Sequence, residues 1–114
     1  MRSGLAVLSI LLAGLPHAAG VAAADPGIRI TAPADGATLD AMDQARLVYE
    51  VTPGPGADHV HVYVDGKEVG ILRRLKGEYT LETLQAGKRE ICIKTVNKAH
   101  VPTGLEQCIQ VTVD

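Results

Sequence analysis

The sequence of 114 residues contains no phenylalanine and no tryptophan, and it has only three tyrosines. A hydrophobic core must therefore be built almost wholly from valine, isoleucine and leucine. Serine is also missing from residues 25–114, which excludes a serine nucleophile there. Neither a Gly-x-Ser-x-Gly elbow nor a glycine-rich phosphate-binding loop is present. We therefore expect a protein that is not an enzyme and has no catalytic residues.

The charged residues are sparse at the start of the chain and scattered after it. Arg2 is the only charged residue before Asp25, and residues 25–114 hold ten basic and thirteen acidic side chains, a net charge of −3. A mildly acidic domain with scattered charges argues against nucleic acid or an anionic membrane surface as the partner.

The first residues have the pattern of an export signal. The apolar run Leu5–Ala13 is short, because a helix needs roughly 20 apolar residues to span about 30 Å of hydrocarbon. Gly14 and Pro16 interrupt it, and the small residues Val21–Ala24 follow. A basic start, a short apolar stretch, a break and an Ala-x-Ala site are typical of a signal peptide cleaved after Ala24, rather than of a membrane anchor.

Cleavage would divide the chain into a signal peptide at residues 1–24 and one domain at residues 25–114. We expect this domain in the periplasm or outside the cell, with no membrane insertion after cleavage. His17 would be removed with the leader and would take no part in function.

The predicted domain is rich in short segments that alternate apolar and polar side chains. Such alternation predicts strands with one buried face, and no helical period is seen. Asp65-Gly66 suits a type I′ hairpin turn, because both central residues of that turn need positive φ. The fold class predicted is all-β, a seven-stranded antiparallel immunoglobulin-like sandwich. The seven predicted strands are Ile28–Thr31, Leu47–Val51, His59–Val64, Val69–Leu72, Tyr79–Thr83, Ile91–Val96 and Cys108–Val113.

Two segments resemble fibronectin type III and related bacterial immunoglobulin-like domains. Leu84–Lys88 followed by Ile91-x-Ile93 resembles the corner before their sixth strand, and Ile30–Gly36 resembles their first strand and turn. Glu90 stands where a corner tyrosine would be expected, and the third predicted strand has no tryptophan. The resemblance implies the sandwich architecture without the antibody hallmarks, and a fold by itself implies no chemistry.

A narrower resemblance is to small periplasmic proteins of unknown function. These proteins carry a histidine-rich third strand and an Asn-x-x-His-Val-Pro loop. The matching residues here are His59-Val60-His61 and Asn97–Pro102.

Cys92 and Cys108 are the only cysteines, and in an exported protein they are expected to pair. If the isoleucines on either side of Cys92 face the core, Cys92 faces outward. If the alternating apolar residues after Cys108 face the core, Cys108 also faces outward. Because the last two strands of such a sandwich are neighbours, both sulfurs would project from one surface, as a cross-strand disulfide requires. A redox or metal role is the alternative, but the pair lacks a C-x-x-C spacing.

Three histidines form the candidate metal site. His59 and His61 lie two residues apart on one predicted strand, so both point to the same face about 6–7 Å apart. The third strand of a sandwich begins where the sixth ends, which places His100, in the following loop, at the same edge. Three imidazoles with an open fourth position suit Cu(II), Zn²⁺ or Ni²⁺ better than Mg²⁺ or Ca²⁺. Asp58 is the nearest extra ligand or hydrogen-bond partner of a ligand.

Two functional hypotheses remain open. The first is a periplasmic module that binds Cu(II) or zinc through the three histidines. The second is a metal-free module that presents the surface bearing Tyr63, Lys94 and Gln110 to another envelope protein or polymer. Two histidines at this spacing also occur by chance on many strands as plain polar surface.

Removal of the leader is a direct prediction of this pattern. We expect the exported protein to begin at Asp25, because the small residues before it form the cleavage site. Intact mass and N-terminal sequencing of the exported protein would check this. A product that still begins at Met1 would contradict the predicted leader.

Overall fold

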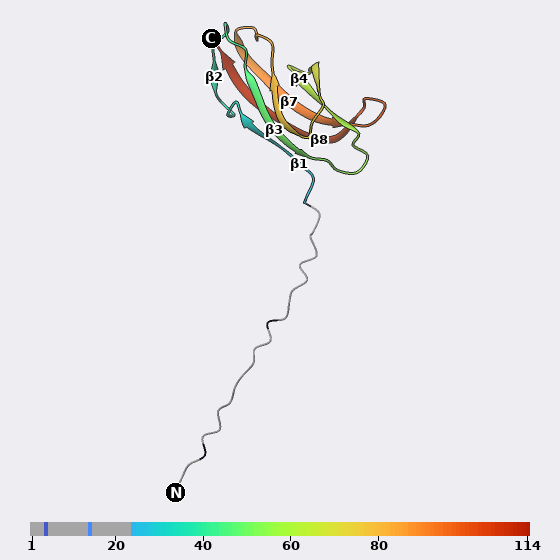
Figure 1. Ribbon diagram of the computed structural model, residues 1–114. Helices are drawn as coiled ribbons and strands as arrows, with labels where there is room; N and C mark the ends of the chain where they lie inside the picture. The colour runs from blue at the N-terminus through green and yellow to red at the C-terminus, as the bar shows by residue number, and fades with distance from the viewer. Residues whose placement is uncertain (1–3, 5–13, 15–23) are drawn as a thin grey trace.

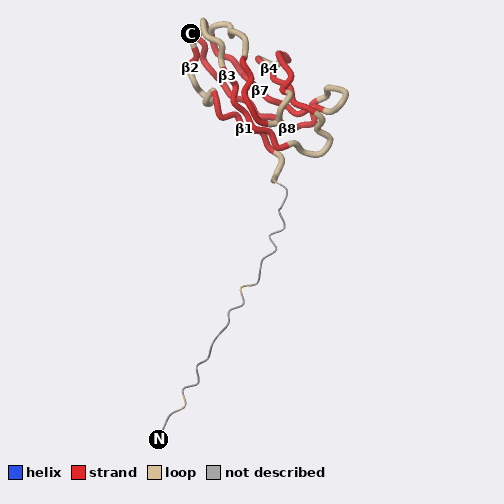
Figure 2. Tube along the Cα trace, viewed as in Figure 1, coloured by secondary structure: helices blue, strands red, loops and turns tan. Residues whose placement is uncertain are grey.

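The computed structural model describes Gly4, Gly14 and residues 24–114, so nearly all of the predicted leader, including His17, lies outside the described residues. The described part of the chain holds eight strands and no helix that is long and apolar enough to cross a membrane (Figures 1 and 2). The strands are β1 (Gly27–Ala32), β2 (Thr38–Leu39), β3 (Arg46–Thr52), β4 (His59–Val64), β5 (Lys67–Leu72), β6 (Lys76–Thr80), β7 (Gly87–Val96) and β8 (Pro102–Val113).

The strands form two sheets, one with the order β1-β3-β6 and one with the order β2-β8-β7-β4-β5. All pairings are antiparallel except that of β2 with the end of β8, which is parallel. The two sheets face each other in a sandwich (Figure 1). The prediction of an all-β sandwich with antiparallel sheets is therefore confirmed. Each of the seven predicted strands overlaps a strand of the structure.

Four strands of the structure differ clearly from the predicted ones, and one of them, β8, begins at Pro102 rather than at Cys108. Thr38–Leu39 forms the additional strand β2, which is too short to show any alternation in the sequence. Strand β6 runs from Lys76 to Thr80 rather than from Tyr79 to Thr83. The sequence misleads there because glycine has no side chain and the exposed edge strand carries polar residues. Strand β7 begins at Gly87 rather than at Ile91, because it pairs with the end of the long strand β8.

The core lies between the sheets and is made of aliphatic side chains. Val60 and Val62 of β4 are almost fully buried, as their alternation with the histidines predicts. Each fully buried valine, leucine or isoleucine stabilises the fold by about 1.5–3 kcal/mol relative to an exposed one. Tyr49 is the one aromatic residue of the buried cluster, and its hydroxyl donates to the carbonyl of Arg74 at 2.8 Å. The core therefore holds β4 with its valines inward.

The turn between β4 and β5 has the conformation that its sequence predicts. Asp65 and Gly66 both have positive φ, 51° and 81°. The Asp65 carboxylate accepts a hydrogen bond from the backbone N–H of Glu90 at 2.9 Å and one from Arg89 at 3.0 Å. These two contacts hold the pKa of Asp65 below its ordinary value. They also tie the hairpin to β7.

A disulfide joins Cys92 to Cys108, as predicted. The two residues are directly opposite each other on β7 and β8. Cys92 is buried yet does not belong to the core cluster, in agreement with its placement on the outer face of the sheet. The bond closes a loop with a sequence separation of 16, which contains the β7–β8 connection.

Loss of this disulfide should destabilise the domain. Opening a loop of this size is worth about 3 kcal/mol in the chain-entropy model, so Cys92→Ala with Cys108→Ala should lower the free energy of unfolding by about that amount. Urea unfolding with and without reductant would measure it, and the double variant should not respond to reductant. Labelling of two free thiols in the exported protein would contradict the bond.

Candidate metal centre

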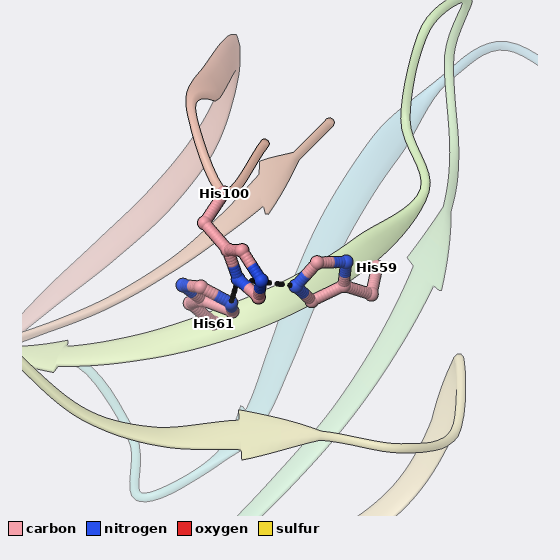
Figure 3. A group of neighbouring side chains, drawn as sticks. All are labelled: His59, His61 and His100. Atoms are coloured by element: carbon pink, nitrogen blue, oxygen red, sulfur yellow. Dashed lines mark hydrogen bonds between the residues drawn. The ribbon is translucent and has the colours of Figure 1, made fainter. Parts of the chain in front are cut away.

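The start of β4 and the end of β7 lie side by side in the larger sheet. His59, the first residue of β4, pairs with Val96, the last residue of β7. The chain then makes the short connection 97–101 and returns as β8. Figure 3 shows that this connection carries His100 over the face of β4 from which His59 and His61 project. The structure thus brings together the three histidines that the sequence singles out.

The connection is held in place by Asn97. The side-chain oxygen of Asn97 accepts hydrogen bonds from the backbone N–H groups of Ala99 at 2.9 Å and Val101 at 3.0 Å, on either side of His100. The backbone N–H of His100 itself donates to the carbonyl of Asn97 at 2.9 Å. His100 has φ of 62°, in the left-handed region that few non-glycine residues adopt. This tight turn directs the imidazole back onto the sheet.

Three ring nitrogens converge in the centre of the site. Nε2 of His59 lies 3.0 Å from Nδ1 of His100, and Nδ1 of His100 lies 3.2 Å from Nε2 of His61 (Figure 3). One ring nitrogen from each histidine lies within 4.8 Å of the other two. For an ion at about 2.0–2.1 Å from each of its ligands in a tetrahedral arrangement, neighbouring ligand atoms are roughly 3.3 Å apart. The spacing of the three nitrogens therefore fits one ion.

Carboxylates lie beside the other nitrogens of two of the rings. Nδ1 of His59 is 3.0 Å from Oδ2 of Asp58, and Nδ1 of His61 is 3.3 Å from Oε1 of Glu68. The second contact does not have good hydrogen-bond geometry, since Nδ1 of His61 is a buried nitrogen without a hydrogen-bond partner. A carboxylate oxygen only accepts, so both contacts favour a proton on Nδ1. In a neutral ring this leaves a bare lone pair on Nε2, the nitrogen that faces the other histidines.

The three histidines differ in burial. His61 is 1 % exposed, His59 is half-buried and His100 is exposed. Burial lowers the pKa of His61 below the ordinary value of 6.5, although the charge of Glu68 acts in the opposite direction. A ring that resists protonation keeps its lone pair available to a metal ion.

Sequence reasoning identified Asp58 and missed Glu68. Asp58 adjoins His59 in the sequence, whereas Glu68 reaches the site from the neighbouring strand β5, where it pairs with Tyr63. The predicted hairpin turn at Asp65-Gly66 contains the information needed to place Glu68. Counting outward from that turn places Glu68 opposite Tyr63, on the face of the histidines.

Other groups on this face have different roles. Tyr63, Lys94 and Gln110 share the outer face of the sheet, and the Lys94 ammonium lies 4.6 Å from the centre of the Tyr63 ring. Lys94 also pairs with Glu106 at 3.5 Å. Glu90 comes close to both cysteines, but their sulfurs are bonded to each other and are not free to bind an ion.

Comparison with known proteins supports the fold and assigns no family. No protein-family model matches the chain, and no curated protein matches it. The fibronectin(III)-like modules of Clostridium thermocellum CbhA superpose with a TM-score of 0.63 at 18 % identity, over 76 % of this chain and 96 % of that chain. A Jonesia denitrificans lytic polysaccharide monooxygenase gives a TM-score of 0.47 at 16 % identity, over 72 % of this chain and 60 % of that chain. The first likeness shows the fold alone.

The described domain therefore has an immunoglobulin-like fold of the fibronectin type III kind, as the sequence resemblance implies. Its candidate site is a cluster of three histidines on the outer face of the larger sheet.

The burial of His61 predicts that the metal-free protein loses stability in weak acid. The folded-state pKa lies below the unfolded value of 6.5, so the unfolded chain binds more protons in the interval between them. Stability is fully present above pH 6.5 and falls as the pH drops toward the folded-state pKa. Urea unfolding in chelator at several pH values would measure this, and His61→Gln should reduce the dependence. Equal dependence in both proteins would contradict the prediction.

Proposed function

We propose that this domain binds one divalent transition-metal ion, Cu(II) or Zn²⁺, through Nε2 of His59, Nε2 of His61 and Nδ1 of His100. The observation that carries the proposal is the convergence of these nitrogens at 3.0 and 3.2 Å. A proton on one of these three nitrogens occupies the lone pair of that nitrogen alone, whereas one metal ion can accept the lone pairs of all three. Carboxylates beside the far nitrogens, as at Asp58 and Glu68, are the usual partners of metal-binding histidines.

The donor set favours a divalent ion of intermediate softness. Imidazole suits copper and zinc, while Mg²⁺ and Ca²⁺ prefer oxygen donors. Soft thiolate and thioether donors that select Cu(I) are not available to the site. Both cysteines are in the disulfide, and Met42, which is 85 % exposed, lies in the connection between β2 and β3.

The role proposed for the ion is a bound cargo or signal rather than a structural support. Structural zinc sites are closed by four protein ligands, and this cluster offers three. The core lies on the opposite face of β4, and the disulfide already joins β7 to β8. We propose a binding module without catalytic residues. A disulfide is in keeping with an oxidising compartment, so we place the module in the periplasm or outside the cell.

Metal binding can be tested with Cu(II) and Zn²⁺ titrations of the purified protein against a competing chelator. We expect one ion per chain. Removing a ligand should cost more than the 10–100-fold typical of a ligand's hydrogen-bond partner, so His59→Ala with His61→Ala should weaken binding by at least about 100-fold. Tyrosine emission provides a second readout, since the chain has no tryptophan and the Tyr63 ring lies 6.2 Å from the ring of His61.

One variant serves as a control for the loss of a charge. Glu106→Gln removes a carboxylate on the same sheet face that pairs with Lys94. It should bind the ion as the unmodified protein does. If the unmodified protein takes up neither ion at micromolar concentration, the proposal is wrong.

A metal-free interaction module is the second candidate. The fibronectin type III-like fold and the surface around Tyr63 and Lys94 support it. It would become the better account of the domain if the titrations showed no uptake of metal.

A further inference from the structure

The histidine cluster leaves one coordination position without a protein ligand. Within residues 24–114, no further imidazole, thiolate or carboxylate oxygen joins the three converging nitrogens. Asp58 and Glu68 lie beside the far nitrogens of His59 and His61, where they cannot also bind the ion. Because His61 is buried and His100 is exposed, solvent reaches the cluster at its His100 end.

The two carboxylates that contact the histidine rings match the charge of a divalent ion. The three ligands are neutral imidazoles, and Asp58 and Glu68 each contribute one negative charge through the rings that they contact. With a divalent ion bound, the cluster of ion, ligands and two carboxylates has no net charge. A fourth ligand that is an anion would add a negative charge near two carboxylates, and their repulsion disfavours it, although solvent reduces the repulsion because both side chains are nearly half exposed.

We propose that the bound ion keeps its fourth position for an uncharged nitrogen donor of the imidazole class supplied from outside the chain. This inference rests on the proposed function. An imidazole matches the softness of the other three ligands and leaves the site neutral. The donor is the histidine side chain of another protein or a free imidazole compound, which present the same chemistry. An ion held in this way can pass to the donor through a ternary complex, in which the three histidines of this domain and the external imidazole bind the ion at the same time.

The experiment uses Cu(II)-loaded protein after one ion per chain has been established. Imidazole and azide are added in separate titrations, followed by electron paramagnetic resonance and visible absorption. We expect imidazole to form a one-to-one ternary complex, to add a fourth nitrogen to the hyperfine pattern, and to leave copper with the protein on gel filtration. We expect azide to bind more weakly than imidazole.

Two variants test the effect of the carboxylate charges on the choice of the fourth ligand. Asp58→Asn and Glu68→Gln keep an oxygen beside Nδ1 of the adjacent ring and remove one negative charge each. Either change should lower the ratio of the azide Kd to the imidazole Kd by about threefold, because both carboxylates are nearly half exposed and solvent screens their charge. Glu106→Gln, on the same face but paired with Lys94, should leave the ratio unchanged. An unchanged ratio in both site variants would overturn the charge argument.

The outcomes separate this inference from the proposed function. Failure to bind copper would overturn both. Bound copper whose spectrum does not respond to imidazole would overturn this inference alone, because the protein itself would then close the coordination sphere. Removal of copper by imidazole would also overturn it. Tighter binding of a single-histidine peptide than of free imidazole would support a protein as the source of the donor, and the reverse order would support a small molecule.

Discussion

The antiparallel pairing of β4 with β7 is the constraint on which the candidate site depends. It places His59 beside Val96, so that the next few residues of the chain pass over β4 and deliver His100. A slip of one residue in a strand turns its whole set of side chains to the other face. Such a slip would put His61 into the core and expose Val60 and Val62, so burial of the valines fixes the position of the histidines.

The stability of the fold and the chemistry of the site use opposite faces of the same strand. The inner face of β4 packs into the aliphatic core, and the neighbouring strands β7 and β8 are joined by the disulfide. The outer face can therefore hold a buried imidazole whose Nδ1 has no well-formed hydrogen bond, which is a cost to stability. A rigid sheet beneath His59 and His61 and a connection held by Asn97 above them position the nitrogens before any ion arrives.

The sequence predicted the parts of the structure that depend on near neighbours. Strict alternation in His59–Val64 gave the two faces of β4, and Asp65-Gly66 gave a turn whose positive φ values the structure shows. The prediction was incomplete where the pattern is weak. Strand β2 has only two residues, and Gly77 in β6 has no side chain to continue an alternation. Glu68 was missed because its place beside His61 depends on the hairpin pairing as well as on its own residue type.

The sequence by itself determined which residue types are available and on which face of each strand they lie. Within residues 25–114, three imidazoles, two cysteines and an aliphatic core follow from composition and from a period of two. Only the tertiary structure decided that the nitrogens of His59, His61 and His100 meet within 3.0 and 3.2 Å, with Asp58 and Glu68 behind two of the rings. Alternation is a local property of one strand, whereas convergence depends on the pairing of β4 with β5 and β7 and on a connection that bends through a left-handed residue.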